Sequence, residues 1–231
     1  SSAPPASPSG SALHHPEMAP LQARLHDQIK DSMVLINIKP PKKASVGKNK
    51  NDKGIFVMGT IIVLQPYFMY VVADPASFHG EGQLKLLIDC LEGTKLELTR
   101  PQIHLTEGIA GIRCPNPGGY NTQLMRAVPL CRSVIAKRQR VHLFSPEQML
   151  LTSGTVMGVS GPTFQHNCST LESSSLGAPV VNDNGHLVGI CNDFRNDYLE
   201  AISTHAIASE IEMAQGREYI GIGQMLDHLQ S

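Results

Sequence analysis

The sequence predicts an all-β fold with one short helix near each end of the chain. Most of its large apolar residues fall in short runs rich in valine and isoleucine, such as GIFVMGTIIVL at 54–64 and YFMYVVA at 67–73. These runs are separated by turn residues, and only two stretches, 17–30 and 204–215, carry apolar residues at helical spacing. A chain of 231 residues can bury roughly 70% of its unfolded surface, so it needs neither disulfides nor a metal to fold.

The charge balance argues against a general attraction to nucleic acids or membranes. The formal net charge is -1 and the sequence pI is about 6.8. Two local basic clusters remain, the lysine-rich loop at 39–53 and a group formed by Arg132, Lys137, Arg138 and Arg140. Neither cluster has interleaved aromatic residues, so we interpret both as solvated surface and expect no nucleic-acid partner.

The cysteine and apolar patterns indicate a soluble intracellular protein, although its compartment cannot be predicted. No signal peptide and no apolar run long enough to cross a membrane is found. The cysteines are odd in number and show no C-x-x-C pair, so we interpret them as reduced, buried thiols and predict no metal or cofactor. They are Cys90, Cys114, Cys131, Cys168 and Cys191.

The first half of the chain predicts a flexible arm, a helix and a series of strands. Residues 1–20 are rich in Ser, Pro and Ala and have too few large apolar groups to pack. In 17–30, Leu21, Leu25 and Ile29 recur every four positions, which predicts an amphipathic helix. Strands are expected at 32–38, 54–64, 67–73, 84–91, 95–98 and within 103–113.

The second half predicts further strands and the second helix. Strands are expected at 141–146 and 151–161, followed by a hairpin in which Val180 and Val181 turn back at an Asn-Gly pair toward 187–190. A strand at 199–202 leads into a helix at 204–215, which Ser203 or Thr204 can cap. Residues 223–231 form a tail.

Several of these motifs resemble trypsin-like serine proteases, most closely the HtrA-type branch. The stretch SSSLGAPVVNDNGHLVGI at 173–190 resembles the family's nucleophile loop, G-x-S-G-G-P followed by an Asn-Gly turn and a Val-Gly-Ile strand. VHLFSP at 141–146 and LTSGTVMGVSG at 151–161 resemble the V-x-x-[IL]-G-x-P and V-T-x-G-x-V-S strands. The resemblance covers about 32–222 in the right order. It implies a chymotrypsin-like double β-barrel in a domain at 21–222, with barrel 1 at about 32–114, barrel 2 at about 124–202 and a C-terminal helix.

Within this resemblance, all three catalytic positions carry residues that cannot do the chemistry. Anchored on Pro179, the nucleophile position holds Leu176, which has no hydroxyl. The histidine position falls on Pro75, and the aspartate position in IHLTEGIAGIR at 103–113 falls on Gly108. The resemblance therefore implies a pseudoprotease, a protease-fold protein without catalysis.

The alternative is an active serine endopeptidase with a displaced triad. His79, Glu107 and Ser175 each lie within a few residues of the family's catalytic positions. Using Ser175 requires the loop to shift by one residue, which reverses where its side chain points and disturbs the oxyanion hole. In addition, Ser174 occupies a position where the family uses glycine to aim a backbone N–H group.

An inactive relative would keep the substrate cleft and use it to bind protein. The resemblance implies that this cleft is lined by the residues Ser174, Ser175, Leu176, Gly177, Asn192, Asp193, Phe194 and Arg195. An extended peptide segment could add to the strand edge there, with Leu176 offering an apolar contact on the floor. Leu176 could equally fill the space left by the lost histidine. A homo-oligomer is a further possible assembly.

Overall fold

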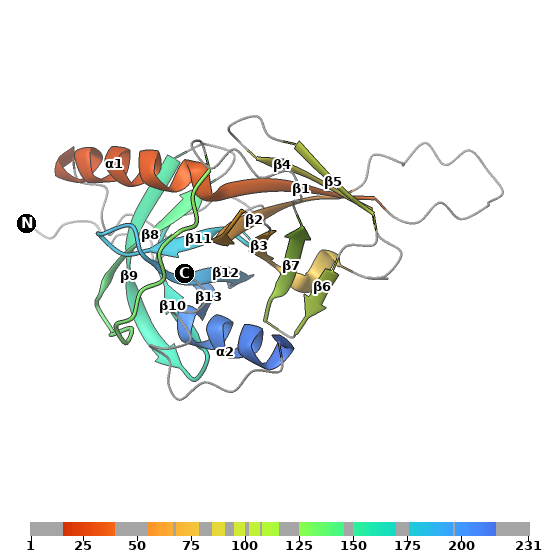
Figure 1. Ribbon diagram of the computed structural model, residues 1–231. Coiled ribbons are helices and arrows are strands. Elements are labelled where there is room, and N and C mark those ends of the chain that lie inside the picture. The colour runs from red at the N-terminus through yellow and green to blue at the C-terminus, as the bar shows by residue number, and fades with distance from the viewer. Residues whose placement is uncertain are drawn as a thin grey trace, which may run out of the picture.

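The computed structural model describes residues 16–39, 55–66, 68–78, 85–90, 95–99, 102–106, 108–115, 125–145, 150–169, 176–195 and 197–215. These residues form two antiparallel β-sheets with a helix at either end (Figure 1). The tail at 223–231, most of the N-terminal arm and most of the lysine-rich loop lie outside the described residues.

The first sheet has seven strands in the order β5-β4-β1-β2-β3-β7-β6. Neighbouring strands are antiparallel throughout, as in the pairs Met33 with Thr60 and Val71 with Ile112. One face of the sheet holds an apolar cluster that includes Val34, Ile36 and Ile88, because alternate side chains of each strand point the same way. The strands are β1 (Met33–Lys39), β2 (Ile55–Leu64), β3 (Phe68–Ala73), β4 (Lys85–Cys90), β5 (Lys95–Thr99), β6 (Gln102–Leu105) and β7 (Ala110–Pro115).

The second sheet closes into a six-stranded barrel in the order β10-β13-β12-β11-β8-β9. Its interior is filled by a separate apolar cluster that includes Val141, Val156, Phe164 and Val188. The two barrel-like sheets confirm the predicted all-β double-barrel fold. The strands are β8 (Arg140–Ser145), β9 (Leu150–Ser160), β10 (Thr163–His166), β11 (Pro179–Val181), β12 (Leu187–Phe194) and β13 (Leu199–Ser203).

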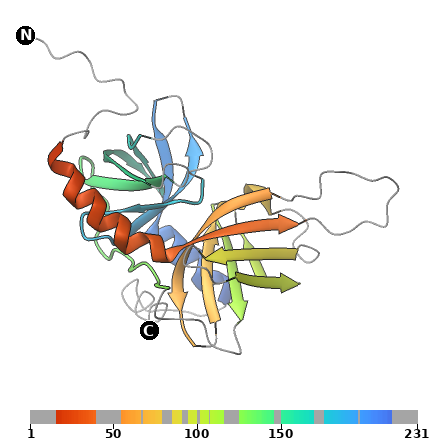
Figure 2. The ribbon, with the colours of Figure 1, turned by 90° about the horizontal axis from the view of Figure 1, so that it is seen from above.

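The predicted helices are present near both ends. Helix α1 (Ala19–Ile29) lies across the outside of the second barrel against β9 and leads through a short 3-10 turn, η2 (Lys30–Ser32), into β1 (Figure 2). Helix α2 (Thr204–Gln215) follows β13, and the Ser203 hydroxyl accepts a hydrogen bond from Ala206 N–H (3.2 Å) at its first turn. Thr204 instead donates its hydroxyl to the Leu187 carbonyl (2.7 Å). Two further 3-10 turns are η1 (Pro16–Met18) and η3 (Pro75–Ser77).

A third apolar cluster fills the seam between the two sheets. It combines Ile62 and Val72 of the first sheet with Ile190 and Ile202 of the second. Leu25 and Ile29 of α1 complete it, and all of these side chains are buried. The cluster explains why the two sheets form one body, since neither sheet can cover this apolar surface alone.

The Asn-Gly turn predicted between β11 and β12 is present. Asn182 Oδ1 accepts hydrogen bonds from the N–H groups of Asn184 and His186, both at 3.0 Å. Gly185 has a φ of +77°, a left-handed conformation that glycine adopts at little cost. The turn residues therefore match the backbone that the hairpin requires.

Gly189 on β12 offers a test of how tightly the barrel is packed. A Cβ atom at Gly189 would lie 2.6 Å from the Ile202 carbonyl oxygen and 2.6 Å from the Phe164 ring. We expect Gly189→Ala to lower the free energy of unfolding by about 2 kcal/mol or more, because neither backbone nor a buried ring can move freely. Urea titration followed by circular dichroism measures this change.

Gly158→Ala on β9 is the matched control. Its Cβ would meet only the end of the Gln165 side chain, at 3.2 Å, which can rotate away. We expect a change within about 0.5 kcal/mol. Equal losses in the two variants would contradict the packing described for Gly189.

Candidate functional site

Two of the three residues aligned with the family's catalytic positions lie beside a close contact at the seam. Gly177 has a φ of +86°, and a Cβ atom there would clash with the Met58 carbonyl oxygen and lie 3.2 Å from Asp74 N. Thr60 Oγ1 donates to the Gly177 carbonyl at 3.3 Å, and both groups are buried. Leu176 precedes Gly177 and Pro75 follows Asp74, so the structure brings these two segments together across the seam.

Neither segment carries a group that can transfer a proton at the aligned position. Pro75 opens the 3-10 turn η3, and Asp74 Oδ2 caps that turn by accepting a hydrogen bond from Ala76 N–H (3.2 Å). The Leu176 side chain is partly buried and packs against the apolar interior of the second barrel. A pyrrolidine ring and an aliphatic side chain provide neither a base nor a nucleophile.

Gly108 lies in the connection between β6 and β7. Its N–H group donates to Thr106 Oγ1 (3.2 Å), which also accepts from Ile109 N–H (3.1 Å). These hydrogen bonds lie entirely within the β6–β7 loop. Among the described residues, no hydrogen bond joins Gly108 to the segments of Pro75 or Leu176.

The residues of the alternative triad, His79, Glu107 and Ser175, lie outside the described residues, as does Ser174. The displaced triad therefore stays a sequence-based hypothesis.

The other predicted cleft residues form the end of β12. The register with β13 shifts between Cys191 and Asp193, so Asn192 sits at a bulge. The Asn192 Oδ1 atom is buried and has no hydrogen-bond partner among the described residues. Arg195 forms an ion pair with Asp193 (2.9 Å), and Phe194 packs partly into the barrel interior.

The electrostatics of this seam favour neutral groups. Burial raises the pKa of Asp74, and the negative charge of Asp193 raises it further, while the Ala76 N–H opposes this shift. Burial also raises the pKa of Cys191 to about 12, so its thiol is protonated at neutral pH. A protonated, buried thiol is a poor nucleophile.

A serine, a histidine and an aspartate do meet, but on the outside of the second barrel. His142 of β8 lies opposite Ser153 of β9, with 2.7 Å between His142 Nδ1 and Ser153 Oγ. His142 Nε2 lies 2.7 Å from Asp183 Oδ1 in the β11–β12 turn, and Arg140 binds the same carboxylate through Nε at 2.8 Å. No sequence pattern indicated this hydrogen-bond network, because its residues come from three separate segments of the sequence.

The surroundings of the Ser153–His142–Asp183 network indicate a structural role. Gln22 of α1 donates a hydrogen bond to Ser153 Oγ (2.8 Å) and so adds to the Ser153–His142–Asp183 network. The Ser153 and His142 side chains are buried. Arg24 of α1 also donates to the Asp183 carbonyl (3.1 Å). This hydrogen-bond network therefore attaches α1 to the second barrel, and Ser153 has no space for a substrate.

Burial and the neighbouring Arg140 determine the charges of His142 and Asp183 in this network. Burial lowers the pKa of His142, although the nearby Asp183 carboxylate opposes the shift. The hydrogen bond from Arg140 lowers the pKa of Asp183. Arg140, which the sequence suggested as solvated surface, is thus an ion-pair partner that keeps the Asp183 carboxylate charged.

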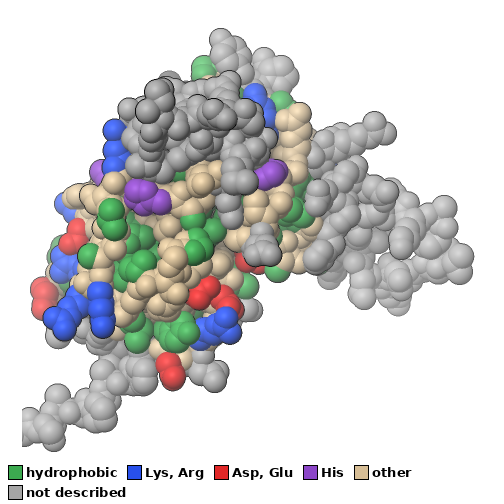
Figure 3. All heavy atoms as spheres, turned by 90° about the horizontal axis from the view of Figure 1, so that it is seen from below, with side chains coloured by type: hydrophobic (Ala, Val, Ile, Leu, Met, Phe, Trp, Pro, Cys, Tyr) green, Lys and Arg blue, Asp and Glu red, His purple; other side chains and the backbone are tan. Residues whose placement is uncertain are grey.

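The remaining surface and core show no second catalytic centre among the described residues. The thiols of Cys114, Cys131, Cys168 and Cys191 are buried and form no disulfide among the described residues, as the cysteine pattern predicted, and no metal-binding cluster occurs in this part of the chain. On the face seen from below, basic side chains stand in small separate groups with acidic ones nearby (Figure 3). None of the described helices is long and apolar enough to cross a bilayer.

A second buried histidine lies inside the barrel. His166 on β10 is fully buried, with Nδ1 accepting from Cys168 N–H (3.3 Å) and Nε2 lacking a partner among the described residues. Burial lowers the pKa of His166 to about 3. Its neutral ring packs 5.9 Å from the Phe164 ring.

Comparisons with known proteins support the fold and leave the activity open. No family model matches the chain, and no curated protein matches it. Among solved structures, the chain is similar to one titled "Crystal structure of Deg5", with a TM-score of 0.62 and 15% sequence identity. The match covers 84% of this chain and 94% of that chain. The chain thus shares the fold of that structure, which agrees with the double β-barrel that its motifs predicted.

Stability should fall as the pH decreases from 7 to 5, with His166 as a main cause. Its folded pKa of about 3 lies below the ordinary value near 6.5, so the folded state favours the neutral ring. The stabilisation is complete above pH 6.5 and is lost as the pH falls toward 3, which amounts to about 2 kcal/mol at pH 5. Urea unfolding at a series of pH values measures this slope.

The matched variants are His166→Asn and His104→Asn. Asparagine at 166 cannot titrate, so its slope between pH 7 and 5 should be shallower than that of the original chain by about 2 kcal/mol. His104 of β6 is only partly buried, and its replacement is the reference for removing a histidine outside the core. An unchanged slope in His166→Asn would contradict the burial of a neutral ring there.

Proposed function

We propose that this chain is a catalytically inactive trypsin-like protease homologue that binds protein segments in the cleft at the seam. The observation that carries the proposal is that Leu176 and Pro75 directly adjoin Gly177 and Asp74, two residues whose backbones approach each other closely at the seam. In a chain with a trypsin-like fold, this is where attack and proton transfer would occur, and neither residue can take part.

A free strand edge supports a binding role for the same place. Strand β12 pairs with β11 up to Ile190, and beyond it the described residues place no strand on that side of Asn192–Phe194. Unpaired backbone groups of this kind can accept an extended segment by β-strand addition. The bulge at Asn192 and the buried, unpartnered Asn192 Oδ1 leave an acceptor that such a segment could satisfy.

Leu176 gives this edge an apolar neighbour. The side chain is partly exposed, so one part packs in the barrel interior while another part faces outward. Phe194 at the end of the edge is also partly exposed. An extended peptide would therefore gain backbone hydrogen bonds from β12 and apolar contacts from these two side chains. Self-association of the domain stays a prediction that light scattering can test.

We expect no serine protease activity. Purified protein should not hydrolyse casein or peptide esters, and a fluorophosphonate probe should not label it, because the proposal places no base beside a serine that could activate it for attack. Active trypsin serves as the positive control for both assays. Labelling that disappears in Ser175→Ala but persists in Ser153→Ala would identify the displaced triad of His79, Glu107 and Ser175 and overturn the proposal.

We expect peptides selected on this protein to depend on Leu176. Twelve-residue peptides chosen from a display library should bind at least about tenfold more weakly to Leu176→Arg, because the apolar contact is lost and a charge must be desolvated. Val134→Arg is the control, since Val134 is 82% exposed and lies outside the seam. Selected peptides that bind both variants equally would show that they use another surface.

A further inference from the structure

A cavity of about 280 Å³ lies beside the C-terminal end of α1, and none of the residues of the proposed peptide-binding cleft line it. Its walls come from α1 and η2 on one side, from the segment 126–129 that joins the two sheets, and from the turn between β11 and β12. The polar side chains that line it are Gln28, Ser32, Arg126, Asn184 and His186. Nothing in the proposed binding of peptides at the seam uses these residues.

The walls of this cavity are fixed by hydrogen bonds of the backbone. Arg126 N–H donates to the Asp31 carbonyl (3.0 Å), Val128 N–H donates to the Ile61 carbonyl (2.9 Å), and Leu187 N–H donates to the Pro129 carbonyl (2.7 Å). The two N–H groups held by Asn182 Oδ1 fix the opposite wall. A cavity that exists before binding does not require ordering of its walls when a ligand enters.

The charge of the cavity is positive. Arg126 forms no ion pair with any described residue, and no aspartate or glutamate lines the cavity. Two carboxylates of the neighbouring elements are engaged elsewhere, because Asp27 pairs with Lys30 (3.5 Å) and Asp183 pairs with Arg140 and His142. The guanidinium of Arg126 is therefore available for an anion, and His186 can add a second donor.

We propose that this cavity binds a small organic anion, with its carboxylate or phosphate group held by Arg126 and His186. Gln28, Ser32 and Asn184 offer neutral hydrogen-bond donors to the same ligand. Ile29, Val128 and Pro129 provide apolar contacts for a short carbon skeleton. The volume lies just below the usual range for ligand pockets, which fits a small ligand.

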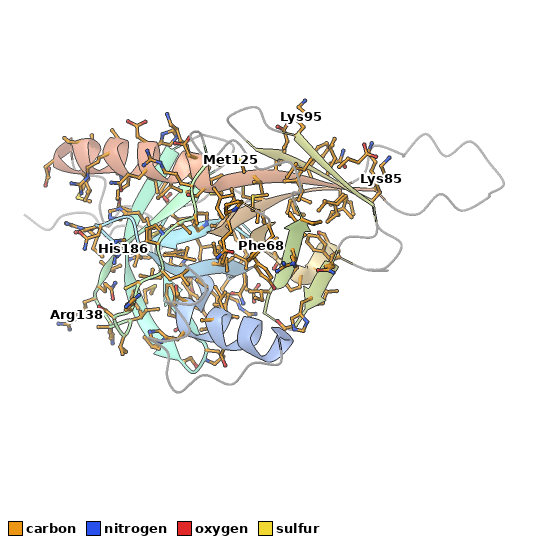
Figure 4. The ribbon with its side chains drawn as sticks, viewed as in Figure 1. Phe68, Lys85, Lys95, Met125, Arg138 and His186 are labelled. Carbon is orange, nitrogen blue, oxygen red and sulfur yellow. The ribbon has the colours of Figure 1, made fainter. Side chains whose placement is uncertain are left out.

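Such a ligand would contact all of the elements that line this cavity. Its partners belong to α1, to the entry into β1, to the segment that joins the sheets and to the second barrel. Binding would therefore stabilise the position of α1 relative to both sheets. Figure 4 labels His186 and Met125, the residue before Arg126, on two sides of this region, and Arg138 below His186 at the outer edge of the second barrel.

Titration calorimetry and amide NMR spectra can test the proposal with citrate, glycerol 3-phosphate and neutral glycerol as probes. We expect one or both anions to bind and glycerol not to bind, with shifts at the amides of Arg126, Gly185 and His186. In Arg126→Gln, the affinity should fall at least about tenfold, because a charged hydrogen bond is lost. Arg138→Gln removes the same charge elsewhere and should leave the affinity unchanged.

Three outcomes would overturn the proposal. One is the absence of binding by both anions at concentrations up to 10 mM, roughly the weakest affinity expected of a specific site. Another is an equal loss of affinity in Arg126→Gln and Arg138→Gln, which would indicate general charge attraction. The last is binding of a peptide with a free C-terminal carboxylate, but of neither anion, at the same amides, which would assign the cavity to a protein partner.

Discussion

The apolar contact between the two sheets is the constraint on which the rest of this structure depends. Each sheet has its own interior cluster, but the buried side chains of the third cluster come from both sheets and both helices. This shared cluster fixes where the end of β3 meets the loop before β11. The left-handed backbone at Gly177 follows from that approach, because a side chain at this position would clash with Met58.

The residues at the seam differ from the hydrogen-bonded residues on the outside of the second barrel. At the seam, Pro75 opens a 3-10 turn and Leu176 packs against the interior of the second barrel. Outside the barrel, a serine, a histidine and an aspartate form a hydrogen-bonded chain that is sealed by Gln22. Residue types that carry catalysis in many enzymes thus hold a helix in place here, because contact between such groups does not by itself make a catalytic centre.

Most of the strands could be predicted from the sequence, because runs such as 54–64 combine β-branched residues with clear turn residues at their ends. Strand β10 was missed, since its four residues include only one large apolar side chain, Phe164. The link between His142 and Ser153 depends on the register of a hairpin, and Asp183 reaches it from a different hairpin. The cavity at Arg126 could not be predicted either, because its walls meet only in the folded chain.

The way α1 is attached determines where this domain can be shortened. Leu25 and Ile29 belong to the seam cluster, and Gln22 and Arg24 hold the polar chain on the second barrel. A recombinant fragment beginning at β1 would retain every strand and still lose part of its central core. It would also open His142 and Ser153 to water, which turns a sealed support into an accessible polar groove. The smallest self-sufficient unit of this protein therefore begins before the first strand, at the helix.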